Sequence, residues 1–238
     1  MRQRGVKKSR WLGLIGWLIA ILCSLFVGIQ LWFLGHIVWW KYQPVQSTAF
    51  MRAQEAKLKQ QDPKFVLKHT FIETSLIAEH LKRAVISAED ANFIDHEGVD
   101  WEAIERAWAK NQKRGKLVSG GSTITMQLAK NLFLSGERSF IRKGEELIVT
   151  WMLETVLDKE RILELYLNSC EWGIGVFGAQ EAAKYYFQVS AAQLSAKQSA
   201  KLAAMLPNPR FYDKQRNHPY LLRRAALINR YMGGAETP

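Results

Sequence analysis

The first forty residues have a different hydrophobic pattern from the rest of the chain. Residues 11–40 contain no Asp, Glu, Lys or Arg. The stretch from Leu12 to Leu34 would form a helix about 34 Å long, which is enough to cross a bilayer core of about 30 Å. The run ends in Trp39 and Trp40 rather than at a small-residue cleavage site. An uncleaved signal anchor is therefore favoured over a secretory signal peptide or a buried core helix.

The charges before this run predict its orientation. They are all basic and come from Arg2, Arg4, Lys7, Lys8 and Arg10. Basic flanks stay in the cytoplasm, so the body is expected outside the cytoplasmic (inner) membrane, in the periplasm or at the cell exterior. The predicted organisation is a cytoplasmic tail (1–10), a single-pass anchor (11–40), a juxtamembrane segment (41–69) and one globular domain (70–238).

The juxtamembrane segment is polar and is punctuated by Pro44 and Pro63. Phe50, Met51 and Leu58 could form one apolar stripe on a helix that lies near the lipid headgroups. A solvated connecting helix explains the same pattern, and the sequence leaves both interpretations open.

Apolar positions in the body recur with a helical period. They fall at residues 77, 81, 84, 85 and 88, and a second stripe consists of Trp101, Ile104, Ala107 and Trp108. Ser122 is expected to cap a third helix that runs to about Leu132. No stretch shows the alternation of a strand. The body is therefore predicted to be mainly α.

Capping residues mark further helices. Ser139 is expected to cap a helix that turns Leu147, Ile148, Trp151 and Met152 inward, and Asp158 is expected to cap the next. Another helix is expected at residues 179–187. Ser195 and Gln198 stand at capping-box spacing, and a last helix should stop at Gly233-Gly234.

Charge and composition narrow the possible partners. The net charge is +11, which suits nucleic acid, a membrane surface or an anionic substrate. No aromatic-basic interleaving or zinc-finger spacing of nucleic-acid-binding proteins occurs, so a membrane or a phosphate group is favoured and no nucleic-acid partner is expected. Cys23 lies in the apolar run, so no disulfide with Cys170 is expected.

The densest chemistry lies in residues 88–98. This stretch contains Glu89, Asp90, Asp95, His96 and Glu97, directly after the first helical stripe. Glu89 falls one position past the apolar face, where a half-buried carboxylate with a raised pKa could act as a catalytic base. The alternative is a solvated helix end. A metal at His96 is disfavoured because no second histidine stands at ligand spacing, so a hydrogen-bonding role is preferred.

A cationic group follows at the start of the helix after Ser139. Arg142, Lys143 and Glu146 share one helix face, and Arg138 precedes them. A surface salt-bridge ladder would explain this group, but cations near free backbone N–H groups also suit a diphosphate. Lys130 could point the same way. The run Gly173-Ile174-Gly175-Val176-Phe177-Gly178 matches the dinucleotide fingerprint, but a helical pattern precedes it. Its glycines are instead expected to form a tight turn and close packing between helices.

Five ordered blocks carry a resemblance to a known family. They are Glu89-Asp90-x-x-Phe93-x-x-His96-x-Gly98, Gly120-Gly121-Ser122-Thr123-Ile124-Thr125-x-Gln127-x-x-Lys130-Asn131, Arg142-Lys143-x-x-Glu146, Ile162-Leu163-Glu164-x-Tyr166-Leu167-Asn168, and Gly178-Ala179-x-x-Ala182-Ala183-x-Tyr185-Tyr186-Phe187. In this order they resemble the peptidoglycan glycosyltransferase family, and more closely its monofunctional, membrane-anchored members. The family usually has Gln-Gln where this chain has Met126-Gln127, which puts a contact of Met126 in doubt.

The resemblance implies a lysozyme-like helical fold with a small membrane-proximal lobe, and the polymerisation of lipid II with release of undecaprenyl diphosphate. It implies Glu89 as the base and Glu146 as a second catalytic carboxylate. The substrate-binding residues that it implies are Asp90, Phe93, His96, Ser122, Thr123, Gln127, Lys130, Arg138, Arg142 and Lys143.

The resemblance also sets expectations for cofactors and partners. No cofactor is obligatory and no dedicated metal site is expected, although Mg²⁺ or Mn²⁺ could neutralise the diphosphate. The expected partners are lipid II, the nascent glycan strand and the bilayer, with cell-division or elongation proteins as candidates. Two other functions are alternatives to glycan polymerisation. A lysozyme-like lytic enzyme would not need the cationic group. A non-enzymatic cell-wall scaffold would be expected to have lost Glu89 or Glu146.

Overall fold

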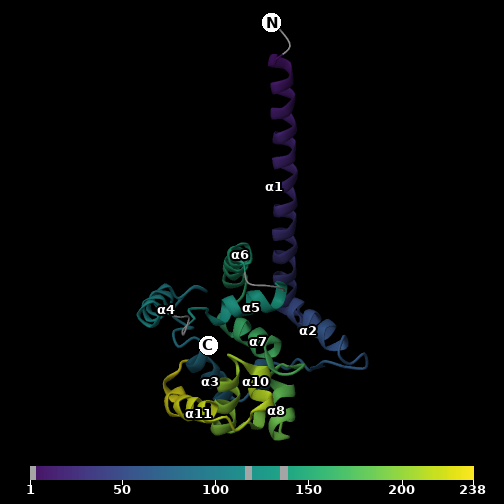
Figure 1. Ribbon diagram of the computed structural model, residues 1–238. Coiled ribbons are helices and arrows are strands. Elements are labelled where there is room, and N and C mark those ends of the chain that lie inside the picture. Colours follow the sequence, from purple (N-terminus) through teal and green to yellow (C-terminus); the bar gives the residue numbers. More distant parts are fainter. Residues whose placement is uncertain (1–3, 116–119, 135–138) are drawn as a thin grey trace.

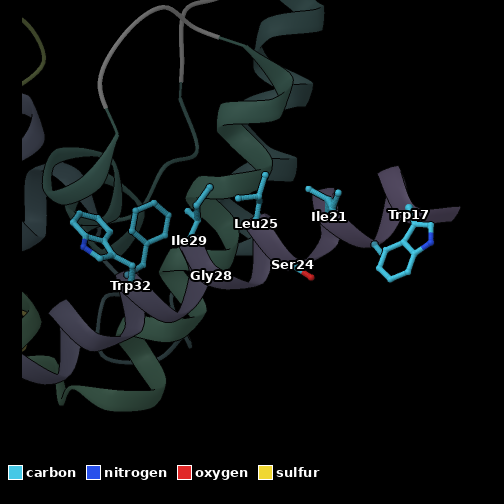
Figure 2. Close-up of a pocket in the computed structure, with 9 residues that line it drawn as sticks. Trp17, Ile21, Ser24, Leu25, Gly28, Ile29 and Trp32 are labelled. Carbon is cyan, nitrogen blue, oxygen red and sulfur yellow. The ribbon is translucent and has the colours of Figure 1, made fainter. Parts of the chain in front are cut away.

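The computed structural model describes residues 4–115, 120–134 and 139–238. One long helix, α1 (Arg4–Tyr42), projects alone from a helical body that gathers around its C-terminal end (Figure 1). The segment Gly13–Tyr42 is the one described helix that is long and apolar enough to cross a membrane. This agrees with the predicted anchor. A shallow pocket along α1 is lined by residues of that helix alone, without an ionisable side chain (Figure 2).

The described part of the body is mainly α, as predicted. Its helices are α2 (Ala49–Lys59), α3 (Glu79–Glu89), α4 (Trp101–Arg114), α5 (Ile124–Phe133), α6 (Phe140–Val156), α7 (Lys159–Ser169), α8 (Ala179–Phe187), α9 (Ala196–Met205), α10 (Pro209–Lys214) and α11 (Pro219–Tyr231). Three short 3-10 turns are η1 (Thr74–Leu76), η2 (Ala191–Gln193) and η3 (Met232–Gly234).

A small sheet is the exception to the all-helical prediction. Its strands are β1 (Lys68–His69), β2 (Glu171–Gly173) and β3 (Val176–Phe177), in the order β1-β3-β2. β1 runs parallel to β3, and β2 runs antiparallel to it. Strands of two or three residues are too short to show an alternating pattern, which is why the sequence did not reveal them.

The glycine-rich run forms the β2–β3 hairpin. Gly175 adopts φ +69°, and a Cβ atom there would collide with the ring of Phe65. The tight turn is therefore confirmed. The close packing is between a strand turn and Phe65 rather than between helices, so that part of the prediction was wrong.

Two groups of packed helices make up the core. In one group, α3, α9 and α11 pack against one another; in the other, α5 packs against α2, α6 and α7. The capping predictions for Ser139, Asp158 and Ser195 are confirmed, because each side chain accepts a hydrogen bond from the first turn of its helix. The prediction that Ser122 caps α5 was wrong, since Thr123 is the residue that caps this helix.

Two apolar stripes that the sequence predicted are partly exposed. On α4, Trp101 and Trp108 are 62% and 68% exposed, and α4 lies to one side of the body (Figure 1). On α6, Trp151 is 56% exposed, whereas Glu146, Val149, Thr150 and Leu153 are the buried residues. The exposed tryptophans belong to the apolar stripe of each helix, so apolar periodicity alone did not identify the face that packs.

The juxtamembrane helix α2 packs on the body, and its position relative to the lipid headgroups stays a prediction. Met51 of α2 is buried and the ring of Phe50 packs 5.9 Å from that of Phe177. α2 therefore packs on the body, against α5.

Candidate active site

Glu89 lies where the two helix groups meet. It is the last residue of α3, and its side chain is 12% exposed. Gln127 of α5 donates from Nε2 to Glu89 Oε2 at 3.0 Å, and Arg224 of α11 lies 3.3 Å from Oε1. The carboxylate is thus held from both groups at once.

A third helix fixes the orientation of Gln127. The hydroxyl of Tyr166, on α7, donates to Gln127 Oε1 at 3.0 Å. This leaves the amide NH₂ to face the carboxylate, which can only accept. Tyr166 is fully buried, and burial raises the pKa of its hydroxyl well above the ordinary value. Tyr166 therefore stays a neutral donor.

Burial raises the pKa of Glu89 above its ordinary value. The hydrogen bond from Gln127 and the positive charges of Arg224 and Lys130 act in the opposite direction, and the charge of Asp90 adds to the increase. The direction agrees with the sequence prediction. A carboxylate of raised pKa is a stronger base when it is ionised.

Asp90 follows Glu89 directly and connects the 88–98 segment to α5. Its Oδ1 accepts from His96 Nε2 at 2.9 Å, and its Oδ2 accepts from the backbone N–H of Ile124, at the start of α5, at 2.9 Å. His96 Nδ1 accepts from the backbone N–H of Gly98. The proton of the neutral ring therefore lies on Nε2. The predicted hydrogen-bonding role of His96 agrees with this geometry.

Gly98 and Thr123 complete this support. Gly98 has φ +84°, and a Cβ atom there would lie 2.6 Å from Thr150 Cγ2. Its carbonyl accepts from Thr123 Oγ1 at 2.6 Å, and the same hydroxyl accepts from the backbone N–H of Met126. Met126 is buried and lines none of the cavities described below.

Phe93 was predicted to bind substrate, but its side chain is fully buried. The ammonium of Lys159 lies 4.7 Å from the ring centroid and donates to the carbonyl of His96 at 2.6 Å. Phe93 and His96 therefore help to position the 88–98 segment, and contact of either side chain with a substrate stays a prediction.

The cationic residues line a separate cavity of about 670 Å³ beside Glu89. It is formed by Gly120, Ser122, Gln127, Lys130, Ser139, Phe140, Arg142, Lys143, Glu146 and Pro207. Lys143 Nζ lies 2.6 Å from Glu146 Oε1 and 3.4 Å from Ser122 Oγ. Arg138 lies outside the described residues.

Gln127 and Lys130 join this cavity to the rest of the site. Both also line a second cavity of about 310 Å³, formed with Tyr166, Glu171 and Arg210 among others. Glu89 itself lines a third, of about 260 Å³, and Ser122 lines both this one and the cationic cavity. Glu89, whose pKa is raised, thus lies beside the cationic cavity. This arrangement suits proton removal next to an anionic leaving group.

Arg224 and Tyr166 contact the Glu89–Gln127 pair, but neither was predicted from the sequence as a site residue. Tyr166 stands in one of the five blocks, so that block could have suggested it. Arg224 lies 135 positions from Glu89, outside every block. The only local signal is its place in a basic pair with Arg223 on an amphipathic helix.

Comparison with known proteins shows which family the chain belongs to. A family model described as transglycosylase matches residues 55–233. The chain belongs to the transglycosylase family. It is 56% identical over 225 residues to a protein named biosynthetic peptidoglycan transglycosylase from Herminiimonas arsenicoxydans, covering 94% of this chain and 97% of that protein. A protein of the same name from Burkholderia pseudomallei strain K96243 is 53% identical over 237 residues, with coverage of 100% and 91%.

The transglycosylase has the mainly helical, lysozyme-like fold that the resemblance implied. It is an enzyme of the glycosyltransferase type. Its single long apolar helix is consistent with membrane anchoring.

Proposed function

We propose that this transglycosylase polymerises lipid II into glycan strands and releases undecaprenyl diphosphate, with Glu89 as the general base. The observation that carries the proposal is the position of Glu89: a shielded carboxylate of raised pKa beside the cationic cavity. The names of its relatives support peptidoglycan as the product.

In this reaction Glu89 takes the proton of the acceptor sugar 4-hydroxyl. The oxygen attacks the anomeric carbon of the donor, the new C–O bond forms, and the bond from that carbon to the diphosphate breaks with inversion. The electron pair leaves with undecaprenyl diphosphate. Because this leaving group is already a stable anion, it needs positive charge rather than a general acid.

Lys130, Arg142 and Lys143 supply that charge in the cavity, and Arg138 is proposed to join them. Glu146 holds Lys143 in place through their 2.6 Å contact. Ser122 and Gln127 line the same cavity and bind the substrate. Asp90 and Thr123 line the cavity of Glu89, where they are proposed to bind substrate. Together with Phe93 and His96 they also fix the loop after Glu89 and the start of α5.

A divalent cation on the diphosphate stays a prediction. No group of three or more His, Cys, Asp or Glu side chains comes together in the parts of the chain that the structure covers. Glu146, the carboxylate of the cationic cavity, is already paired with Lys143. These residues do not make a cage for Mg²⁺ or Mn²⁺. No step of the proposed reaction is assigned to the ion.

The proposed location is the cytoplasmic (inner) membrane, with residues 1–10 inside and the enzymatic body on the outer side. The bilayer, lipid II and the nascent strand are the proposed partners, and cell-division or elongation proteins are further candidates. Both sugar substrates carry polyprenyl tails, so an enzyme anchored in the same membrane meets them at its surface.

Purified protein incubated with labelled lipid II tests this function. The expected product is a polymer that lysozyme digests, and Glu89→Gln is expected to form none. Release of fragments from a preformed glycan strand would instead indicate the lytic reaction. Neither product from the parent protein would indicate a scaffold.

A further inference from the structure

The outer end of α1 is part of the core of the body. Ile37 is fully buried, and Phe33 and Val45 are 7% and 1% exposed. The ring of Phe133 on α5 packs against Phe33 and Trp40, with centroids 4.6 and 5.2 Å apart. A flexible tether would not bury these side chains against the body.

Arg161 of α7 binds the end of this helix. Its Nε and Nη2 donate to the carbonyl of Trp40 at 2.9 and 2.7 Å, and Nη2 also donates to the carbonyl of Gln43 at 2.6 Å. Its Nη1 pairs with Glu164, whose other oxygen accepts from the backbone N–H of Thr74 at 2.7 Å. The guanidinium therefore joins α1 to two further segments of the body.

The chemistry of a helix end explains why an arginine suits this position. The last carbonyls of a helix have no partner within it and carry partial negative charge. A guanidinium presents several donors in a fixed plane and can satisfy more than one of these carbonyls at once. The side chains of Arg161 and Glu164 are 17% and 8% exposed, so water competes little for these contacts.

A second polar contact lies further along α1. Gln30 Nε2 donates to Glu145 Oε1 of α6 at 2.6 Å. Residues 30–43 thus form a seam about 20 Å long at ~1.5 Å per residue. The seam contacts α5, α6 and α7, the helices that carry Lys130, the Arg142–Glu146 group and Tyr166.

We propose that Arg161 is a positioning residue that locks the membrane helix to the catalytic body, so that the cleft keeps a fixed height and orientation above the bilayer. The effect on catalysis rests on the proposed function, since it requires substrates whose tails lie in the same membrane. The contact of Arg161 with α1 does not depend on the reaction, so it can be measured separately from catalysis.

Distances between two spin labels measure the lock directly in full-length protein in bilayers. One label goes on Cys23, which is exposed on α1, and the other on Lys214→Cys, an exposed site of α10. Cys170 is buried and its pKa is raised well above the ordinary value, so it resists labelling. A narrow distribution is expected for the parent and a broad one for Arg161→Gln. A broad parent distribution, or an Arg161→Gln distribution as narrow as that of the parent, overturns the proposal.

The polymerisation rate measures the effect of the lock on catalysis. Arg161→Gln is expected to lower polymerisation of full-length lipid II in bilayers about tenfold more than polymerisation of a short-chain analogue in detergent, because ~1 Å of misplacement can cost up to ~100-fold. Gln30→Leu should act in the same direction. Arg83→Gln is the matched control, since Arg83 also pairs with a glutamate and a backbone carbonyl, those of Glu79 and Gly233.

Equal losses in the two assays would mean that Arg161 only stabilises the fold, and would overturn the positioning role. If the parent forms no polymer in either assay, the proposed function fails instead. The label distances then still decide whether the lock exists.

Discussion

Glu89 and Glu146 are two shielded carboxylates that are held in different ways. Their side chains are 12% and 5% exposed, and each lies within ion-pair distance of a basic side chain. The ammonium of Lys143 lies 2.6 Å from Glu146, whereas the guanidinium of Arg224 lies 3.3 Å from Glu89 and also contacts the carbonyl of Ala88. Glu89 additionally accepts from the neutral amide of Gln127.

The difference fits the proposed roles, in which Glu89 accepts a proton and Glu146 holds a cation. The short contact between its carboxylate and the ammonium group suits Glu146 to holding Lys143. Glu89 has a longer ion-pair contact and a pKa raised by burial, which suits the proposed base. Similar exposure therefore does not imply a similar role.

The largest expected effect tests this division of roles. Glu89→Gln is expected to lower lipid II polymerisation by at least about 100-fold, the scale of a lost general base. Glu146→Gln removes one charge-assisted contact and is expected to cost about tenfold. Both are measured as initial rates of polymer formation. The reverse order of losses would assign the base to Glu146.

Thermal unfolding serves as the control for Glu89→Gln. The raised pKa means that folding favours the protonated form of Glu89, so its contribution to stability is present below the ordinary pKa and is lost as the pH rises through the folded value. At neutral pH the neutral glutamine should therefore keep or raise the midpoint. A large drop would point to a folding defect instead.

The pH profile sharpens the role of Arg224. The acid limb of kcat/KM is expected above the ordinary pKa of a glutamate, because burial raises the pKa of Glu89. Arg224 lowers this pKa, so Arg224→Met should move the acid limb to still higher pH while the rate at high pH changes less. An unmoved limb would exclude Arg224 as a partner of the titrating group. Arg223→Met, on the same helix, is the matched control.

The sequence predicted the helices well where a capping side chain marked their start. Ser139, Asp158 and Ser195 each cap the expected helix. Strands of two or three residues carry no such signal. The exposed Trp101, Trp108 and Trp151 show that an apolar stripe does not reveal which face packs, since that depends on the neighbouring helices.

The sequence could predict several residues of the site but not the long-range contacts that join them. The family resemblance implied Glu89, Gln127 and Lys130 as residues of one site. It could not show that Arg224 closes the site from α11, because a contact across 135 positions depends on how α3, α9 and α11 pack. Nor could it show that Phe93 is buried beneath Lys159.

The Lys143–Glu146 pair gives a smaller, asymmetric effect on stability. Lys143→Met leaves the carboxylate of Glu146 buried without its partner, which is expected to cost about 1–3 kcal/mol. Glu146→Gln leaves Lys143, which is 43% exposed, free to be hydrated and should cost less. At about 2–4 °C per kcal/mol for a domain of this size, thermal midpoints resolve the two. Equal drops would indicate that the pair acts only through packing.

The smallest expected effects concern the caps of the helices that carry the partners of the two carboxylates. Thr123 caps α5, which carries Gln127, and Ser139 caps α6, which carries Lys143. Ser139→Ala is expected to cost about 1 kcal/mol. Thr123→Val should cost more, because its hydroxyl also donates to the carbonyl of Gly98 at 2.6 Å in a buried setting. Ser122→Ala, at the exposed neighbouring position, should leave the thermal midpoint unchanged. A drop equal to that of Thr123→Val would show that Ser122 is the capping residue of α5.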